Sequence, residues 1–149
     1  MSYNELRKGR HSESGREYLL TTVVQARAPV FRNLAAARAC ILQLPTTERE
    51  TGARWLAWVL MPDHFHGLVT LGERADLATL MRQLKGASAR AVNQVLDRRG
   101  PLWQPAYHDR ALRREDDRLA VARYIVANPL RAGLVNGLGD YPHWDSVWL

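Results

Sequence analysis

The stretch "ARWLAWVLMPDHFHGLVTL", residues 53–71, decides the fold of this chain. Large apolar residues dominate 53–61 and predict a strand, and a second strand-forming run, HFHGLVTL, begins at His64. Only Pro62 and Asp63 separate the two runs. Because so short a connection joins antiparallel neighbours, the stretch predicts a β-hairpin.

The rest of the chain supplies one more strand before the hairpin and one after it. A first strand is predicted over 17–26, and apolar residues recur at helical spacing from Pro29 to Pro45. An amphipathic helix follows over 75–99, a short strand over about 107–113, and a helix over 115–127 that runs to Asn128-Pro129. This order predicts an α+β, ferredoxin-like split βαβ fold: an antiparallel sheet with helices on one face, plus an added helix.

Length and composition predict one domain over residues 1–149, with a basic N-terminal arm (about 1–16) and an aromatic C-terminal tail (about 134–149). The 46% hydrophobic residues suit a packed globular core. The N-terminus lacks a signal-peptide core and no apolar run is long enough to span a bilayer, so we expect a cytoplasmic protein with no membrane partner. The single cysteine, Cys40, excludes a disulfide framework and is expected in the core.

The net charge of +6 is carried almost wholly by arginine, since Lys8 and Lys85 are the only lysines. The planar guanidinium fits a phosphate through two contacts, which favours a nucleic-acid partner. The codon preference of a GC-rich genome would give the same bias. Charge alone leaves both explanations open.

Side chains alternate along a strand, so His64 and His66 share one face and Phe65 points to the core. The two imidazoles would stand within reach of one metal ion, although two nitrogens do not complete a site. Tyr124 and Asn128 are four residues apart, about one turn on a helix. The Asn128 amide oxygen suits a hard cation, and the Tyr124 phenol suits a nucleophile.

A metal ion and a tyrosine together suit attack on a phosphodiester, with a 5′-phosphotyrosine as the product. The four side chains would converge if the final helix crosses the open face of the sheet. The alternatives are an exposed polar strand face for the histidines, a core-edge aromatic for Tyr124 and a helix stop at Asn128-Pro129.

The blocks "MPDHFHGLVTL" (61–71) and "YIVANPLRAGLV" (124–135) resemble the signature pair of the single-tyrosine HUH transposases, in particular the REP-associated tyrosine transposase family. The blocks at 6–22, 102–113 and 140–148 are also similar, so the resemblance covers essentially the whole chain. It differs at Arg110, where a histidine often follows the aspartate in that family.

The resemblance implies that His64, His66 and Asn128 hold one Mg²⁺ or Mn²⁺ ion and that Tyr124 is the nucleophile. It implies nicking and strand transfer of single-stranded DNA beside palindromic hairpins. A monomer with its site assembled in cis is expected rather than a homodimer. The alternatives are a domesticated hairpin-binding protein and a phosphoesterase that uses water instead of Tyr124.

The candidate DNA contacts are basic residues in four parts of the chain, and Trp103 is either a base-stacking residue or a core residue. Those in the arm would grip a hairpin, unless the arm only confers solubility, and those of the long helix would extend that surface or form its solvated face. The candidates are Arg7, Lys8, Arg10 and Arg16 in the arm, Arg82 and Lys85 in the helix, Arg113, and Arg131.

Overall fold

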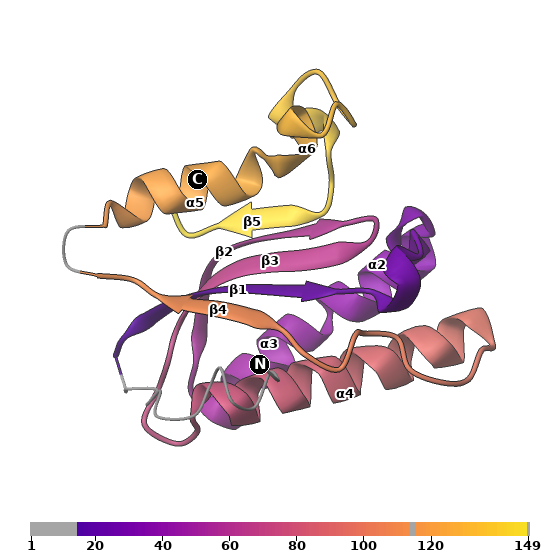
Figure 1. Ribbon diagram of the computed structural model, residues 1–149, viewed down its shortest axis with the longest axis horizontal. Helices are drawn as coiled ribbons and strands as arrows, with labels where there is room; N and C mark the ends of the chain where they lie inside the picture. Colours follow the sequence, from indigo (N-terminus) through magenta and orange to yellow (C-terminus); the bar gives the residue numbers. More distant parts are fainter. Residues whose placement is uncertain (1–14, 114–115, 149) are drawn as a thin grey trace.

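The computed structural model describes residues 15–113 and 116–148, which form three layers (Figure 1). The middle layer is a five-stranded antiparallel sheet in the order β4-β1-β3-β2-β5. Its strands are β1 (Glu17–Val23), β2 (Arg54–Met61), β3 (His64–Thr70), β4 (His108–Ala111) and β5 (Trp144–Ser146). The predicted α+β, ferredoxin-like fold is confirmed, with β5 as an added edge strand.

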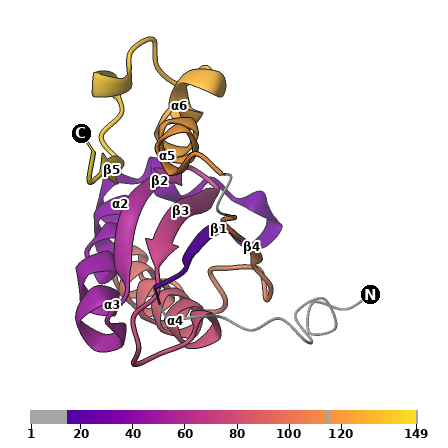
Figure 2. The same ribbon diagram turned by 90° about the vertical axis from the view of Figure 1, so that its left-hand side faces the viewer.

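The lower layer consists of α2 (Leu34–Ile41), α3 (Gln43–Thr51) and α4 (Leu77–Leu96), which cover one face of the sheet (Figures 1 and 2). Leu20 and Leu60 of the sheet are buried against Leu80 and Met81 of α4 in one apolar cluster. Phe65 belongs to this cluster and meets Trp55 edge-on, with ring centroids 5.3 Å apart. The alternation of β3 therefore sends Phe65 to the core, as predicted.

The upper layer consists of α5 (Arg118–Val126) and α6 (Asn128–Arg131), on the opposite face of the sheet (Figure 2). Ile125 of α5 packs with Val59 of β2 and Leu68 of β3 in a second apolar cluster. The sheet thus has an apolar cluster on each face, and the added helix crosses the face that the other helices leave open, as predicted.

The segment between β1 and α3 differs from its predicted form. Two short 3-10 turns, η1 (Gln25–Arg27) and η2 (Val30–Arg32), come first. The helix begins only at Leu34, because the Asn33 side chain caps it by accepting from Ala36 N at 3.0 Å. A helix from Pro29 to Pro45 was therefore wrong. Pro45 lies in the first turn of α3, where a missing N–H leaves no helical bond unmade.

The C-terminal tail contains more regular structure than its aromatic composition indicated. The 3-10 turn η3 (Leu138–Asp140) leads into β5, which pairs with the edge of β2. The Tyr141 hydroxyl donates to the carbonyl of Leu60 at 2.5 Å, and Trp144 Nε1 donates to that of Leu138 at 3.2 Å. The β5 pairing and the Tyr141–Leu60 bond hold the tail against the sheet, and the Trp144–Leu138 bond lies within the tail.

Cys40 is buried in the lower core, as expected from its apolar surroundings. Trp103 is also buried, with 5% of its surface exposed, and its indole N–H donates to Ser88 Oγ at 2.9 Å. Of the two roles considered for Trp103, the core role is the one observed. Within 15–113 and 116–148, no helix is long and apolar enough to cross a bilayer.

Candidate active site

The two histidines of β3 face the upper layer. His64 pairs across the sheet with Met61 and His66 with Val59, and directly paired residues of antiparallel strands share a face. Met61 and Val59 both belong to the apolar cluster that α5 completes. The imidazoles therefore lie on the face of the sheet that α5 and α6 cover, side by side as the alternation predicted.

His64 has a carboxylate partner in the turn that precedes it. Its Nδ1 lies 2.8 Å from Oδ1 of Asp63, and Arg27 Nη1 donates to Oδ2 of the same carboxylate at 3.2 Å. Burial raises the pKa of Asp63, but the hydrogen bond and charge of His64, with those of Arg27, outweigh it and leave the pKa below its ordinary value. The carboxylate is thus held ionised beside the ring.

His66 is half-buried, and among the described residues its buried Nε2 atom has no hydrogen-bond partner. Burial lowers the pKa of His66 to about 4, and the positive charges of His64 and Arg131 add to this shift. The ring is therefore neutral near pH 7, the form that binds a metal. A buried ring nitrogen without a partner is the feature that a bound ion would satisfy.

Tyr124 is carried by α5, with its side chain turned away from the apolar cluster. The carboxylate of Asp117 caps this helix by accepting from the backbone N–H of Leu119 and of Ala120 at 3.0 and 3.1 Å. Ile125, next to Tyr124, is fully buried, whereas Tyr124 is 59% exposed. The phenol is therefore accessible to a large substrate, and a core-edge role for this tyrosine does not describe it.

The helix that carries Tyr124 does not continue through Asn128. It ends at Val126, and the four-residue α6 begins at Asn128 after Ala127. Pro129 has no N–H to donate to the carbonyl four residues earlier, so the continuous helical ladder is interrupted there. The predicted stop at Asn128-Pro129 agrees with this end, but the half-buried Asn128 also begins a new turn that contacts β2 and was not predicted.

Arg131 connects the tyrosine to the histidines. Its Nη1 donates to the carbonyl oxygen of Tyr124 at 2.6 Å, and its guanidinium carbon lies 3.6 Å from the centroid of the Tyr124 ring. This is within the range of a cation–π contact. The same cation lowers the pKa of His66, so its charge acts on both groups.

The donor set fits a divalent cation. The two imidazoles would supply nitrogen ligands, and the amide of Asn128 would supply an oxygen ligand. Within the described part of the chain, no three His, Cys, Asp or Glu side chains gather as a metal cluster. A third ligand from the described residues would therefore be a side chain other than His, Cys, Asp or Glu, such as the amide of Asn128. The ligand roles of all three residues stay predictions.

The other predicted basic residues are distributed over the whole molecule. Arg82 and Lys85 belong to α4, in the layer opposite the histidines. The Lys85 ammonium is occupied by the backbone carbonyls of Gln104, Pro105 and Ala106, at 2.8, 3.1 and 3.4 Å. Lys85 therefore fastens the loop before β4 to α4.

Arg113 follows β4 near the segment that leads to α5, and its backbone N–H donates to Asp116 Oδ2 at 2.7 Å. Arg110, at the position that departs from the family pattern, pairs with the same carboxylate at 3.1 Å. Arg16 precedes β1, while Arg7, Lys8 and Arg10 of the predicted arm lie outside the described residues.

Two features of the site were missed by the sequence reasoning: the Asp63–Arg27 pair and the position of Arg131 against Tyr124. Asp63 was interpreted only as a turn residue, although a carboxylate directly before a candidate ligand histidine was a usable signal. Arg27 carried no signal, because its approach depends on backbone angles that composition does not reveal.

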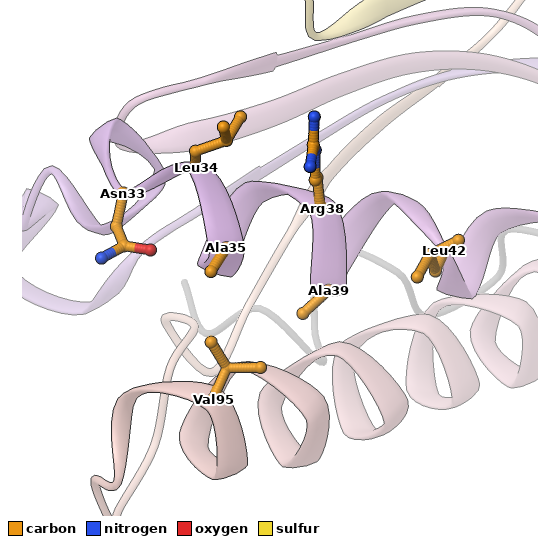
Figure 3. A pocket seen from close by; sticks show the side chains of 7 residues that line it. All are labelled: Asn33, Leu34, Ala35, Arg38, Ala39, Leu42 and Val95. Atoms are coloured by element: carbon orange, nitrogen blue, oxygen red, sulfur yellow. The ribbon is translucent and has the colours of Figure 1, made fainter.

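An apolar hollow of about 640 Å³ lies in the lower layer, between α2 and the end of α4 (Figure 3). Leu34, Leu42 and Val95 line it and are about half exposed or more. Its lining has neither a histidine nor a tyrosine. It is separate from the candidate active site, which lies across the sheet.

The fold and the side chains above the sheet define the class of protein: an α+β ferredoxin-like chain whose central strand carries two histidines beneath a tyrosine-bearing helix. The family model of IS200-like transposases matches residues 13–128, more than half of the chain. The chain therefore belongs to the IS200-like transposase family.

A curated relative from Escherichia coli K12, named REP-associated tyrosine transposase, is 31% identical over 87 residues. The match covers 58% of this chain and 50% of the relative, so the chain spans about half the length of that protein.

Two solved structures share the fold. One, of a REP-associated tyrosine transposase bound to a REP hairpin, has a TM-score of 0.70 at 24% identity over 91% of this chain and 79% of that one. The other, a crystal structure of a protein from Deinococcus radiodurans R1 provisionally named a transposase, has a TM-score of 0.58 at 26% identity, over 78% of this chain and 93% of that one.

Proposed function

We propose that this chain nicks single-stranded DNA beside palindromic hairpins and transfers the strand through a 5′-phosphotyrosine intermediate. The observation that carries the proposal is Arg131, whose cation lies against the ring of the exposed Tyr124 and acts on the buried His66. Both observations support one site that contains the tyrosine and the histidine pair. The hairpin partner is supported by the relative whose structure contains a REP hairpin.

The chain's own residues divide the reaction between them. The Tyr124 oxygen attacks the phosphorus, the bond to the 3′ oxygen breaks, and loss of the phenol proton is balanced by protonation of the released 3′ oxygen to a 3′-hydroxyl. Rejoining reverses these steps with a new 3′-hydroxyl, so no outside energy is needed. His64, His66 and Asn128 would hold Mg²⁺ or Mn²⁺, which supplies Lewis-acid polarisation of the phosphate.

Arg131 has a defined place in this scheme. Its contact with the Tyr124 ring holds the phenol side chain, and its remaining N–H groups are suited to a phosphate oxygen. We propose the cis arrangement, in which one chain supplies the histidines and the tyrosine, and action as a monomer in the cytoplasm, where chromosomal DNA is present.

A covalent-trapping assay tests the proposal. The protein is incubated with labelled single-stranded oligonucleotides that carry the palindromes flanking its own gene, with Mg²⁺, Mn²⁺ or EDTA, and is then denatured. We expect a metal-dependent labelled protein band that Tyr124→Phe reduces by at least about 10³-fold, because the nucleophile is lost.

Tyr141→Phe is the matched control, since it removes a phenol that is bound to the carbonyl of Leu60. It should retain the adduct. An undiminished adduct in Tyr124→Phe would refute the nucleophile, cleaved DNA without an adduct would indicate attack by water, and tight hairpin binding without cleavage would indicate a domesticated binder.

A further inference from the structure

Asp63, in the turn between β2 and β3, lies between the imidazole of His64 and the guanidinium of Arg27. The carboxylate oxygens are 2.8 Å from His64 Nδ1 and 3.2 Å from Arg27 Nη1. An ionised carboxylate only accepts hydrogen bonds, so the proton of the first contact belongs to Nδ1. The other ring nitrogen, Nε2, then carries the free lone pair.

The backbone holds this turn in place from the segment that follows β1. The N–H of Val24 donates to the carbonyl of Asp63 at 2.8 Å, and the N–H of Phe31 donates to that of Pro62 at 3.0 Å. The same segment supplies Arg27. The position of the Asp63 carboxylate is therefore set by backbone contacts as well as by its cation.

Arg27 reaches the carboxylate from an unusual backbone conformation. Ala26 and Arg27 have φ angles of 58° and 51°, in the left-handed region that non-glycine residues rarely adopt. The side chain of Arg27 is 66% exposed, and ion pairs so exposed contribute little to stability. The ion pair alone therefore does not offset the cost of this backbone conformation.

We propose that Asp63 is a positioning residue, which Arg27 steadies, and that it fixes His64 as the Nδ1–H tautomer and presents Nε2 to the metal ion. This inference rests on the proposed metal site. A carboxylate behind a ligand imidazole orients the ring and raises the basicity of the nitrogen that binds the metal. Among the described residues no carboxylate is hydrogen-bonded to His66, so the two ligands would differ in strength.

The first test needs no metal. Long-range ¹H–¹⁵N correlation spectra of the imidazoles report which nitrogen of His64 carries the proton. We expect Nδ1–H in the unaltered protein and a shift toward Nε2–H in Asp63→Ala. Asp63→Asn should be intermediate, because its amide oxygen still accepts a hydrogen bond. Glu50→Gln, which removes an exposed carboxylate on α3, is the control.

The second test measures Mn²⁺ affinity by the paramagnetic resonance signal of the free ion, without DNA. Loss of a partner behind a ligand weakens metal binding by about 10–100-fold. We expect that loss in Asp63→Ala, a smaller loss in Asp63→Asn, a smaller one again in Arg27→Met, and none in Glu50→Gln. If Asp63→Ala fails to fold, the asparagine and Arg27 variants decide the question.

Unchanged tautomer and unchanged affinity in the Asp63 variants would overturn the inference. A changed tautomer with unchanged affinity would also overturn it, because the role toward the metal would be gone. Failure of the unaltered protein to bind Mn²⁺ would instead refute the proposed metal site, and with it the role of Asp63 toward the metal.

Discussion

His64 and His66 occupy equivalent positions on β3, yet their surroundings differ. His64 has a carboxylate partner at 2.8 Å, whereas the buried Nε2 of His66 has no partner among the described residues. Burial favours the neutral form of an imidazole. The pair therefore combines one ring that is hydrogen-bonded to a carboxylate with one that burial keeps neutral.

Because burial lowers the pKa of His66 in the folded state, we expect the metal-free protein to lose stability in acid. The folded-state pKa of about 4 lies below the ordinary 6.5, so between these values the unfolded chain binds more protons than the folded one. Stability should hold above about pH 6.5 and fall by about 3 kcal/mol toward pH 4. Urea denaturation of the unaltered protein and of His66→Gln at pH 7 and pH 4.5 measures it.

Glutamine does not titrate, so His66→Gln should lose less stability between these two pH values than the unaltered protein. Equal losses in the two proteins would show that His66 is not the group responsible.

We expect replacement of Arg131 to slow the formation of the covalent adduct without abolishing it. Arg131→Ala removes the contact with the Tyr124 ring and the hydrogen bond to its carbonyl, so we expect adduct formation to slow about tenfold. Arg131→Lys keeps the charge but not the planar fork and should be intermediate. Single-turnover trapping rates measure the effect, with Arg123→Ala on the exposed side of α5 as the control.

At the scale of the elements, two prolines lie in the first turns of helices whose starts were not predicted. Pro45 lies inside the first turn of α3, and Pro129 lies at the start of α6. Both positions tolerate a missing N–H, because the first turn of a helix leaves its donors unpaired in any case. A proline in the sequence marks a helix boundary without showing on which side the helix lies.

The chain reverses direction after β3 at Gly72, a position where we expect only glycine to fit. A Cβ at Gly72 would lie 2.5 Å from the carbonyl oxygen of Gly52, the residue that ends α3 with a φ of 77°. Gly72→Ala must therefore displace backbone, and we expect a loss of about 1–3 kcal/mol in the free energy of unfolding. Gly139→Ala meets nothing within 4 Å and should change it by less than about 0.5 kcal/mol.

The sequence predicted those parts of the site that follow from periodicity. The shared face of His64 and His66 and the burial of Phe65 require only the two-residue repeat of a strand. The Asp63–Arg27 contact depends on two left-handed residues and on hydrogen bonds between distant segments, which no local pattern shows. The short helix α6 was missed because Asn128-Pro129 was interpreted only as a stop and not as the start of a new turn.

At the scale of the whole molecule, the sheet separates two differently composed sides. The histidines of β3 face α5 and α6, the upper-layer helices that carry Tyr124 and Arg131, whereas Arg82 lies on α4 in the lower layer (Figure 1). A single strand of DNA bound at the candidate site would contact the upper layer. The net charge of +6 alone does not distinguish the two sides.

The salt dependence of DNA binding tests this arrangement. Each phosphate contact on a single strand contributes about 0.7 to the slope of log K against log salt concentration. We expect Arg131→Gln to reduce the slope by about 0.7, and Arg82→Gln to leave it unchanged. Fluorescence anisotropy with a labelled hairpin oligonucleotide measures both. A reduced slope in both variants would show that the DNA also reaches the lower layer.

The alternation of β3 has a consequence for how such a gene decays. One set of alternate residues holds His64 and His66, and the other holds Phe65 of the lower core. Insertion or deletion of one codon within β3 would exchange the two sets, so folding and chemistry would be lost together. With the proposed roles, a substitution at His64 or Tyr124 would remove the chemistry and spare the core. Inactive copies that still bind hairpins should therefore arise through point substitutions, and codon-length changes in β3 should be absent from them.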